Sequence, residues 1–360
     1  MKFLLVAGAR PNFMKIAPVL EAFRPYRAAH QVRLVHTGQH YDASMSDNFF
    51  HDLGIPEPDV NLGVGSASHA EQTARVMVEF EQVCLKDTPD WVVVVGDVNS
   101  TLACALTAKK LGIRVAHVEA GLRSRDMSMP EEINRICTDT ISDLLFTTDR
   151  IASENLLREG LSPRKIKFVG NTMIDTLLRH IGRARELPLP AGLASRRYAA
   201  LTLHRPANVD CERTLAGIME AIRGIANRIP IVFPVHPRTA GRLNGYSRHP
   251  NLRVVEPMSY FAFLGLVAHS RMVLTDSGGI QEETTVLGIP CVTLRENTER
   301  PITCEMGTNT LAGRDPARIR AAAAAVLEAP PPSPRQPEMW DGRAAHRIVE
   351  LLLNEHPLPC

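Results

Sequence analysis

The sequence predicts an α/β fold made of two doubly wound parallel sheets, each in its own domain. Short runs of β-branched and aliphatic residues alternate with longer amphipathic segments, which is the rhythm of βαβ units. The runs are apolar throughout, as strands must be when helices cover both faces of a sheet. In addition, 360 residues exceed what one hydrophobic core usually supports, so two domains are expected.

The first half of the chain contains the first series of buried strands. We expect them at Phe3–Ala7, Val32–Thr37, Trp91–Val95, Arg114–Val118 and Leu144–Thr147. The segments between them, such as Thr101–Leu111 and Glu132–Ser142, have the period and length of helices. The stretch Glu186–Gly192 contains Pro and Gly, which interrupt regular structure, and is the expected linker. The first domain is therefore predicted to span residues 1–180.

The second half repeats the same rhythm. Its expected strands are Tyr198–Leu203, Ile231–Val235, Leu252–Val255, Met272–Thr275 and Pro290–Leu294. They define a second doubly wound domain over residues 181–340. The last helix, at about Gly342–Leu353 within residues 341–360, is expected to pack back on the first domain. Ligands of such sheets bind at the carboxyl ends of the strands, so two facing domains imply a cleft there.

The composition excludes several classes of protein. With 44% hydrophobic residues, 22% charged residues and a net charge of +2, the chain has no general attraction to nucleic acid. Its seven cysteines are odd in number, scattered and without a CxxC pair, which argues against a disulfide framework or structural zinc and favours a reducing cytoplasm. No run approaches the roughly 20 apolar residues of a membrane span. No metal-ligand spacing occurs among the 13 histidines.

Three carboxylates follow neighbouring elements in the first half. Asp97 comes after an apolar run and Gly96, Glu119 ends the next strand, and Glu131 begins a helix. Because the carboxyl ends of parallel strands meet at one edge of a sheet, these side chains can converge in one cleft. Burial there raises the pKa of a carboxyl group, which suits an acid or base that works near neutral pH.

Each of these acids also has a purely structural explanation. Asp97 can cap the helix that follows it. Glu119 can form an ion pair with Arg123 or Arg125. The dipole of the helix alone favours Glu131 in its first turn. Convergence of all three in one cleft would instead push their pKa values apart and divide acid from base.

The segment after Met272–Thr275 predicts an anion site. Ser277, Gly278 and Gly279 form a turn whose N–H groups, together with the dipole of the following helix, can hold a phosphate. Glu283 lies one turn further on and could accept hydrogen bonds from ribose hydroxyls. If the two glycines only tightened a turn, the many polar residues of this segment would have no explanation.

Two cations follow the first strand. Gly8 lets the chain turn tightly, and Arg10 and Lys15 can be presented to a phosphate. The segment lacks both GxGxxG and the P-loop pattern, so NAD and ATP are not expected ligands. Taken alone, such cations are more often solvated surface charges.

His204 and His236 stand at the ends of two strands in the second half. His204 occupies the position in its domain that Arg10 occupies in the first domain, and we expect it to face the same cleft. His236 is placed similarly, but its flanking prolines also favour a turn. A lone histidine at a strand end is otherwise an ordinary polar terminus.

Eight motifs resemble those of one known family. They are GARPNFMKIAP, TGQHYD, GDVNSTLA, HVEAGLRS, PEEINR, TLHRP, TDSGGIQEE and NTERP, and the last ends at Pro301. In these motifs the chain is similar to the non-hydrolysing UDP-N-acetylglucosamine 2-epimerases. The resemblance implies a GT-B fold with two Rossmann-like domains, a homodimer, and a role in supplying cell-surface polysaccharide synthesis. It also implies interconversion of UDP-GlcNAc and UDP-ManNAc without NAD or metal.

The resemblance further implies a role for each candidate residue. Asp97, Glu119 and Glu131 would transfer protons, and His204 would support the departing UDP. The residues implied to contact UDP are Arg10, Lys15, Ser277, Gly278, Gly279, Glu283 and Arg300, and His236 is a further substrate-binding candidate from its place at a strand end. The implied reaction eliminates UDP to give 2-acetamidoglucal, and readdition after protonation on the other face inverts C2.

One part of the chain departs from the family. Regulated bacterial members have a second UDP-GlcNAc site beside the active site, with a glutamine and arginine pattern. Here Gln39 and His40 match, but Asp42 and the stretch Ser66–Glu71 do not supply the basic residue. The pattern for allosteric activation is therefore incomplete.

Three other functions remain open. A GT-B glycosyltransferase shares the fold and the donor site but does not need three carboxylates around C2. A hydrolysing relative would release UDP and free ManNAc if water reached the glycal. A non-catalytic UDP-sugar binding protein would keep the turn at Ser277–Glu283 and would lose the carboxylates, all of which are present.

Overall fold

The computed structural model describes the chain except for residues 39–53, 236, 244, 247, 331 and 356–360. Among the residues named above, Gln39, His40, Asp42 and His236 lie outside the described part, and so does the side chain of Arg10. The chain divides into two compact units. Unit 1 comprises Met1–Thr176 and Glu338–Cys360, and unit 2 comprises Leu177–Pro337.

Unit 1 is built on a seven-stranded parallel sheet. Its strands are β1 (Lys2–Ala7), β2 (Gln31–His36), β3 (Val60–Asn61), β4 (Trp91–Val95), β5 (Arg114–Ala120), β6 (Leu144–Thr147) and β7 (Ile166–Phe168). Their order in the sheet is β3-β2-β1-β4-β5-β6-β7. All five predicted strands of this half are present, and every residue of β4 is buried, as its uninterrupted apolar sequence predicts.

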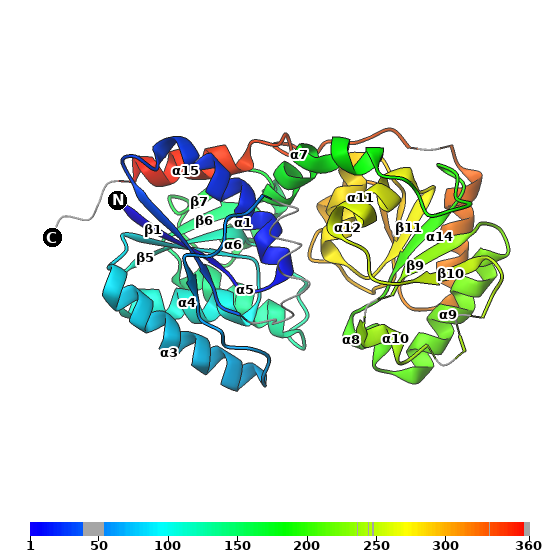
Figure 1. The fold of residues 1–360 in the computed structure, drawn as a ribbon, viewed down its shortest axis with the longest axis horizontal. Coiled ribbons are helices and arrows are strands. Elements are labelled where there is room, and N and C mark those ends of the chain that lie inside the picture. The colour runs from blue at the N-terminus through cyan, green and yellow to red at the C-terminus, as the bar shows by residue number, and fades with distance from the viewer. Residues whose placement is uncertain (39–53, 236, 244, 247, 331, 356–360) are drawn as a thin grey trace. The chain divides into compact units, whose positions relative to one another are not determined.

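Helices cover both faces of this sheet. They are α1 (Arg10–Ala22), α3 (His69–Asp87), α4 (Asn99–Lys110), α5 (Pro130–Ile141), α6 (Arg150–Arg158), the start of α7 (Thr172–Glu186), and α15 (Ala344–Asn354). Helix α4 packs between α3 and α5, whereas α1 and α15 pack against each other on the opposite face (Figure 1). No helix in the described part of the chain has the length and apolar character needed to cross a membrane.

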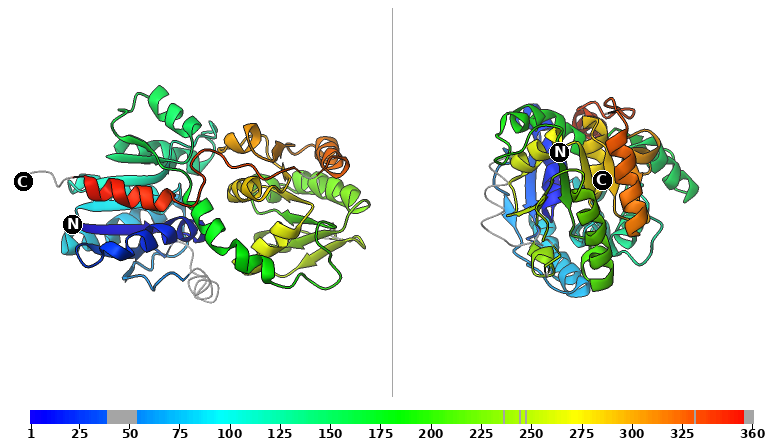
Figure 2. Two further views of the ribbon diagram at one scale, coloured as in Figure 1. Left: turned by 90° about the horizontal axis from the view of Figure 1, so that it is seen from above. Right: turned by 90° about the vertical axis from the view of Figure 1, so that its right-hand side faces the viewer.

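The end of the chain returns to unit 1. Trp340 is buried and its Nε1 donates a hydrogen bond to the carbonyl of Thr148 at 2.9 Å. Helix α15 then lies alongside α1 (Figure 2). The carboxylate of Asp175 in α7 accepts hydrogen bonds from the first two N–H groups of α15, those of Ala344 and Ala345, at 3.1 and 2.7 Å. Asp175 therefore acts as the N-terminal cap of a distant helix.

Unit 2 repeats the architecture with a six-stranded parallel sheet. Its strands are β8 (Ala199–Thr202), β9 (Ile231–Pro234), β10 (Leu252–Val255), β11 (Met272–Thr275), β12 (Cys291–Thr293) and β13 (Asn309–Leu311). The order is β10-β9-β8-β11-β12-β13. The five strands predicted for this half are present, so the predicted α/β class with two parallel sheets is confirmed.

The helices of unit 2 also cover both faces of their sheet. Apart from the rest of α7, they are α8 (Pro206–Val209), α9 (Glu212–Ala226), α10 (Pro237–Ala240), α11 (Tyr260–His269), α12 (Gly278–Leu287), α13 (Ile302–Glu305) and α14 (Pro316–Glu328). Helices α9 and α14 pack together over a core of buried aliphatic side chains. Helices α11 and α12 contact each other (Figure 1). The carboxyl ends of all strands in a unit lie at one edge, where the loops carry the candidate residues.

The attachment of α15 gives a first prediction. Replacing Asp175 with alanine should lower the free energy of unfolding by about 1–3 kcal/mol, because two buried N–H groups lose their acceptor. Glu338→Ala is the matched control, since it removes a carboxylate of the same returning segment that pairs with Arg150 at the surface, where an ion pair contributes little. Urea denaturation measures both variants. Equal losses would mean that Asp175 does not hold the helix.

Candidate active site

The candidate residues form two groups, one in each unit. The carboxylate cluster of unit 1 contains Asp97, Glu119 and Glu131 with their partners at the ends of β4 and β5 and the start of α5. The α12 cluster of unit 2 contains His204 and the residues around Ser277 at the end of β11 and the start of α12. Each group is described within its own unit.

Glu119 is held in an unusual backbone conformation. Its φ is +71°, in the left-handed region, where β5 has a bulge between Val118 and Ala120. This conformation costs a non-glycine residue about 1–3 kcal/mol and is typical of functional positions. The side chain is buried, and its Oε2 pairs with Nζ of Lys15, which is also buried on α1. Lys15 therefore supplies the opposite charge that a buried carboxylate at this position needs.

Gly96 makes room for this ion pair. Its φ is +71°, and a Cβ added there would lie 3.3 Å from Nζ of Lys15 and 3.4 Å from Oε2 of Glu119. A side chain at this position would crowd the pair and would be strained in its backbone. The turn after β4 therefore brings the backbone next to Asp97 directly against the Lys15–Glu119 pair.

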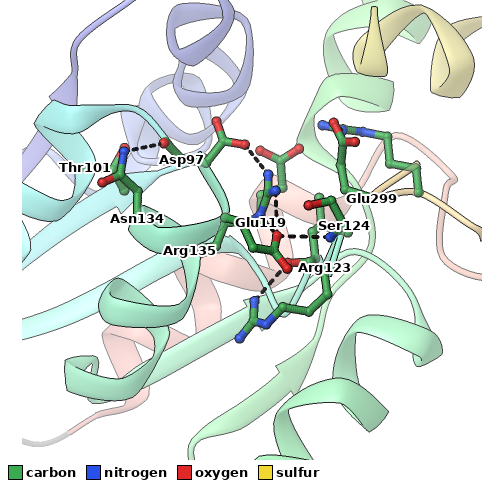
Figure 3. A network of polar contacts seen from close by, with 12 residues as sticks. Asp97, Thr101, Glu119, Arg123, Ser124, Asn134, Arg135 and Glu299 are labelled. Atoms are coloured by element: carbon green, nitrogen blue, oxygen red, sulfur yellow. Dashed lines mark hydrogen bonds and ion pairs between the residues drawn. The ribbon is translucent and has the colours of Figure 1, made fainter. Parts of the chain in front are cut away.

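Asp97 is paired with an arginine. Its side chain is 25% exposed, and its Oδ2 lies 2.5 Å from Nη1 of Arg135 on α5. The amide of Asn134 donates to the carbonyl of Asp97 at 2.9 Å (Figure 3). The N-cap residue of α4 is Val98 and not Asp97, so Asp97 does not hold the expected capping position. The carboxylate thus stays partly open to solvent while a buried cation orients it.

Glu132 and Arg135 hold the Asp97 carboxylate in place, and neither was predicted as a site residue. Glu132 is buried and accepts hydrogen bonds from the N–H groups of Ser124 and Arg125 at 3.0 and 2.8 Å. It also accepts from Nη2 of Arg135 at 2.7 Å. Burial alone would raise the pKa of Glu132, but these hydrogen bonds and the arginine charge outweigh it and lower the pKa. Arg135 therefore links Glu132 to Asp97.

Glu131 lies in the first turn of α5, next to Glu132, and is partly buried. The N-cap of this helix is Met129, which contributes no side-chain cap. The arginines proposed as partners of Glu119 have other partners: Arg123 pairs with Asp139 and Glu159, and the Arg125 guanidinium donates to Asn155. Glu119 pairs with Lys15 instead, so the predicted contact of Lys15 with UDP stays a prediction.

The start of α12 has the expected form of an anion site. Ser277 is its N-cap and makes no side-chain hydrogen bond to the helix, and Gly278 and Gly279 are its first residues. A Cβ at Gly278 would lie 2.4 Å from Nη1 of Arg300, so a larger residue there would displace this guanidinium. The N–H groups of the first turn have no side-chain cap, which is the arrangement that binds phosphate.

Asp276 positions His204 and was missed by the sequence reasoning. It is fully buried, and its Oδ1 lies 2.9 Å from Nδ1 of His204. Its Oδ2 also accepts from the N–H groups of His204 and Arg205, at 3.0 and 2.9 Å. Burial raises the pKa of Asp276, but the hydrogen bonds from His204 and Arg205 together with the charge of the ring lower it overall. Because Nδ1 faces Asp276, this buried carboxylate fixes the orientation of the His204 ring.

Arg300 is buried in an ion-pair network of unit 2. Its Nε lies 2.9 Å from Glu282, and its Nη1 lies 2.6 Å from Glu299. Arg295 pairs with the same Glu299 at 2.8 Å, and Arg205 approaches it at 3.5 Å. Three arginines thus surround one glutamate beside the start of α12. The predicted contact of Arg300 with UDP is not tested by this network.

Glu283 is a buried acid on the inner side of α12. Its Oε1 accepts a hydrogen bond from the hydroxyl of Tyr260 at 3.2 Å. Burial raises the pKa of Glu283 to about 7, with a smaller contribution from the nearby Glu282 and against the opposing hydrogen bond from Tyr260. Hydroxyl donors of a ribose would favour the ionised form, so the predicted ribose contact remains chemically reasonable.

The two units together define a class of protein. Each is a doubly wound parallel sheet with polar groups at the carboxyl ends of its strands, which is the GT-B architecture of nucleotide-sugar enzymes. A glycotransferase of kitacinnamycin, 12% identical, has the same fold with a TM-score of 0.62 over 99% of both chains. This likeness establishes the fold alone.

Comparisons with known proteins identify the family. A model of the UDP-N-acetylglucosamine 2-epimerase family matches residues 26–353. The UDP-N-acetylglucosamine 2-epimerase of Methanocaldococcus jannaschii is 41% identical, over 98% of this chain and 99% of its own. The crystal structure of that enzyme with UDP-GlcNAc and UDP has a TM-score of 0.90 over 99% of this chain and 100% of its own. The chain therefore belongs to the UDP-N-acetylglucosamine 2-epimerase family and is an isomerase.

A further relative acts on a different sugar. The UDP-2,3-diacetamido-2,3-dideoxy-D-glucuronate 2-epimerase of Pseudomonas aeruginosa is 45% identical, over 87% of this chain and 88% of its own. The two relatives share inversion at C2 of a UDP-sugar and differ in the substituents at C3 and C6. The resemblance seen in the sequence motifs is confirmed at the level of the family.

The pKa of Glu283 gives a prediction on stability. In the folded state this pKa is about 7, above the ordinary value of 4.5, so the folded protein favours the neutral acid. The resulting stability is fully present below about pH 4.5 and is lost as the pH rises to about 7. Glu283→Gln stays neutral, and we expect its thermal midpoint relative to the wild type to increase from pH 5 to pH 8.

Scanning calorimetry at several pH values measures this difference. Glu305→Gln, which changes an exposed glutamate of the same unit, is the control and should follow the wild type at every pH. If the Glu283→Gln curve also ran parallel to the wild type, Glu283 would be ionised throughout, and its burial would be compensated by groups other than Tyr260.

Proposed function

We propose that this enzyme interconverts UDP-GlcNAc and UDP-ManNAc by eliminating UDP to 2-acetamidoglucal and adding it back. The observation that carries the proposal is the carboxylate cluster, in which Asp97, Glu119 and Glu131 stand on three elements of unit 1. Buried cations hold two of these acids in place. The relative from Methanocaldococcus jannaschii, whose structure contains UDP-GlcNAc and UDP, supports the same substrate.

The chemistry requires acids and bases on both faces of the sugar. The proton at C2 is not acidic, so its removal must accompany departure of UDP from C1. A carboxylate takes the proton, the C2–H electron pair forms the C1=C2 bond, and the C1–O pair leaves with UDP. In the second step, an acid on the opposite face protonates C2 while a phosphate oxygen of UDP adds to C1. Protons and electrons balance without an oxidant or reductant.

The three carboxylates are the proposed proton carriers. Asp97 and Glu119 stand beside Arg135 and Lys15, and these cations orient the two carboxylates. Glu131 contributes a third carboxyl group from the start of α5. Because the reaction runs in both directions, each acceptor in one direction is a donor in the other.

The α12 cluster is proposed to bind the diphosphate. Negative charge grows on UDP as the C1–O bond breaks, and preorganised donors that meet it usually make the largest contribution to catalysis. The N–H groups at Gly278 and Gly279 and the dipole of α12 supply such donors. His204, oriented by Asp276, would support the departing UDP. Arg10, Lys15 and Arg300 are the further proposed UDP contacts, Glu283 the ribose contact, and His236 a further substrate-binding candidate.

A second substrate is favoured by one comparison. The Pseudomonas aeruginosa relative at 45% identity acts on a 2,3-diacetamido-glucuronate. The proposed chemistry at C1 and C2 would be unchanged, because the additional acetamido group lies at C3 and the carboxylate at C6. A homodimer, as the family resemblance implies, is proposed for either substrate. The scattered cysteines favour its location in the cytoplasm.

The reaction itself is tested by proton NMR in D₂O. With UDP-GlcNAc and no added cofactor, we expect signals of UDP-ManNAc with deuterium at C2, because the removed proton exchanges with solvent before it returns. Free ManNAc and UDP would identify a hydrolysing enzyme instead. An unchanged spectrum with UDP-GlcNAc but turnover of UDP-2,3-diacetamido-2,3-dideoxy-glucuronate would identify the second substrate. No reaction with either sugar would overturn the proposed function.

The carboxylate roles are tested by isosteric variants. Asp97→Asn, Glu119→Gln and Glu131→Gln should each lower kcat by roughly 100-fold or more, as expected for general acid–base groups. Calorimetry should show that their affinity for UDP is nearly unchanged, since unit 2 is intact. The control is Glu71→Gln, an exposed glutamate of α3 that pairs with Arg75. Near wild-type turnover in all three variants would remove these residues from the mechanism.

A further inference from the structure

We propose that the buried ion pair between His117 and Asp139 is a positioning device that fixes the three carboxylates relative to one another. The pair lies in unit 1 behind the carboxylate cluster, and its proposed role rests on the proposed epimerase function. Neither residue belongs to the predicted site. His117 is on β5 and Asp139 is on α5, and both are fully buried.

The hydrogen bonds of His117 define its charge. Its Nδ1 lies 2.7 Å from Oδ1 of Asp139, and its Nε2 lies 2.8 Å from the carbonyl oxygen of Gly96. A carbonyl oxygen can only accept, so Nε2 carries a proton. The Asp139 carboxylate also accepts, so Nδ1 carries the second proton. The ring therefore donates from both sides and is an imidazolium.

Asp139 connects this cation to the rest of the cluster. Its Oδ2 accepts from the N–H of Gly121 at 3.1 Å and lies 2.7 Å from Nη1 of Arg123. Burial by itself raises the pKa of Asp139, but the charge of His117 and the hydrogen bonds from His117 and Arg123 lower it overall. Asp139 is thus an anion between two cations, and Glu159 pairs with the outer one. The network is electrically balanced although most of it is buried.

The pair touches each of the three elements that carry a carboxylate. The carbonyl that His117 binds belongs to Gly96, directly before Asp97. The N–H that Asp139 binds belongs to Gly121, two residues after Glu119, and so fixes the strained bulge in which Glu119 stands. Asp139 itself lies on α5, which begins next to Glu131. One ion pair thereby sets the distances between β4, β5 and α5.

The location of these contacts favours positioning over simple stabilisation. A buried ion pair is weak support for stability, because apolar side chains of similar size often serve as well. This pair instead binds two backbone groups that flank the carboxylates, the carbonyl of Gly96 and the N–H of Gly121. The turns there are unusual, because Gly96, Glu119 and Gly121 all have positive φ. A Cβ on Gly121 would lie 2.3 Å from the carbonyl of Ala152, so that turn has no freedom to shift outward.

Asp139→Asn tests the role of the charge. The amide oxygen can still accept from Gly121 or Arg123, but its NH₂ group faces His117, so the ring must become neutral to accept from it. We expect kcat to fall by roughly 10- to 100-fold, as for other residues that orient catalytic groups. The KM for UDP-GlcNAc and the affinity for UDP should change by less than about threefold, because the α12 cluster is intact.

Asp143→Asn is the matched control. Asp143 accepts from the N–H of Val115 at 2.8 Å and pairs with Lys109, so it pins the opposite end of the same strand. This variant removes an anion that contacts the start of β5 and leaves the three carboxylates unchanged. Its kcat should therefore stay near the wild-type value. Equal losses of kcat in Asp139→Asn and Asp143→Asn would mean that the pair only stabilises the strand, and this outcome would overturn the proposal.

A second measurement does not depend on activity. In wild-type protein labelled with ¹⁵N-histidine, both ring nitrogens of His117, assigned with His117→Gln, should carry protons at neutral pH. One unprotonated ring nitrogen would overturn the proposal, even if Asp139→Asn failed to fold. Wild-type turnover is recorded in the same series. A wild type without epimerisation would contradict the proposed function, whereas an active wild type with an equally active Asp139→Asn variant would contradict only the positioning role.

Discussion

Buried charge must be paired, and this constraint organises both clusters. In unit 1 two candidate carboxylates pair with cations from other elements: Lys15 from α1 meets Glu119 of β5, and Arg135 from α5 meets Asp97 after β4. An unpaired carboxylate at these positions would cost several kcal/mol or take up a proton. The packing of α1 and α5 on the sheet therefore decides both the charge and the direction of the carboxylates.

At Asp276, unit 2 meets the same constraint largely with backbone N–H groups. Asp276 is surrounded by the N–H groups of His204 and Arg205 and by the His204 ring. The start of α12 offers N–H groups without a side-chain cap. Donors of this kind are fixed by the fold and need no reorganisation when an anion arrives, which makes them effective for charge that appears during a reaction. The candidate carboxylates of unit 1 thus depend on side-chain cations, whereas the N–H groups at the start of α12 are fixed by the backbone.

The sequence predicted the fold well and failed where strands are not fully covered. All ten predicted strands are present, whereas β3, β7 and β13 were missed. These three are edge strands of only two or three residues, and none is fully buried. Because a helix layer does not enclose them, they have no uninterrupted apolar run, and that run was the signal on which the prediction depended.

The site was predictable to the extent that it follows strand ends. Asp97 and Glu119 were identified because each follows a buried run, but their partners depend on packing that no local pattern contains. The spacing of Glu132 and Arg135 places them on one helix face, yet it does not show that Arg135 reaches Asp97.

Glu119 is the clearest case of a feature that the sequence does not predict. Its backbone is in the left-handed region, which would be expected of glycine, and the sequence gives no sign of this conformation. Such a conformation persists only where surrounding contacts hold it, and the hydrogen bond from Gly121 to Asp139 and the ion pair with Lys15 are those contacts. The strained backbone of Glu119 therefore depends on the buried ions around it.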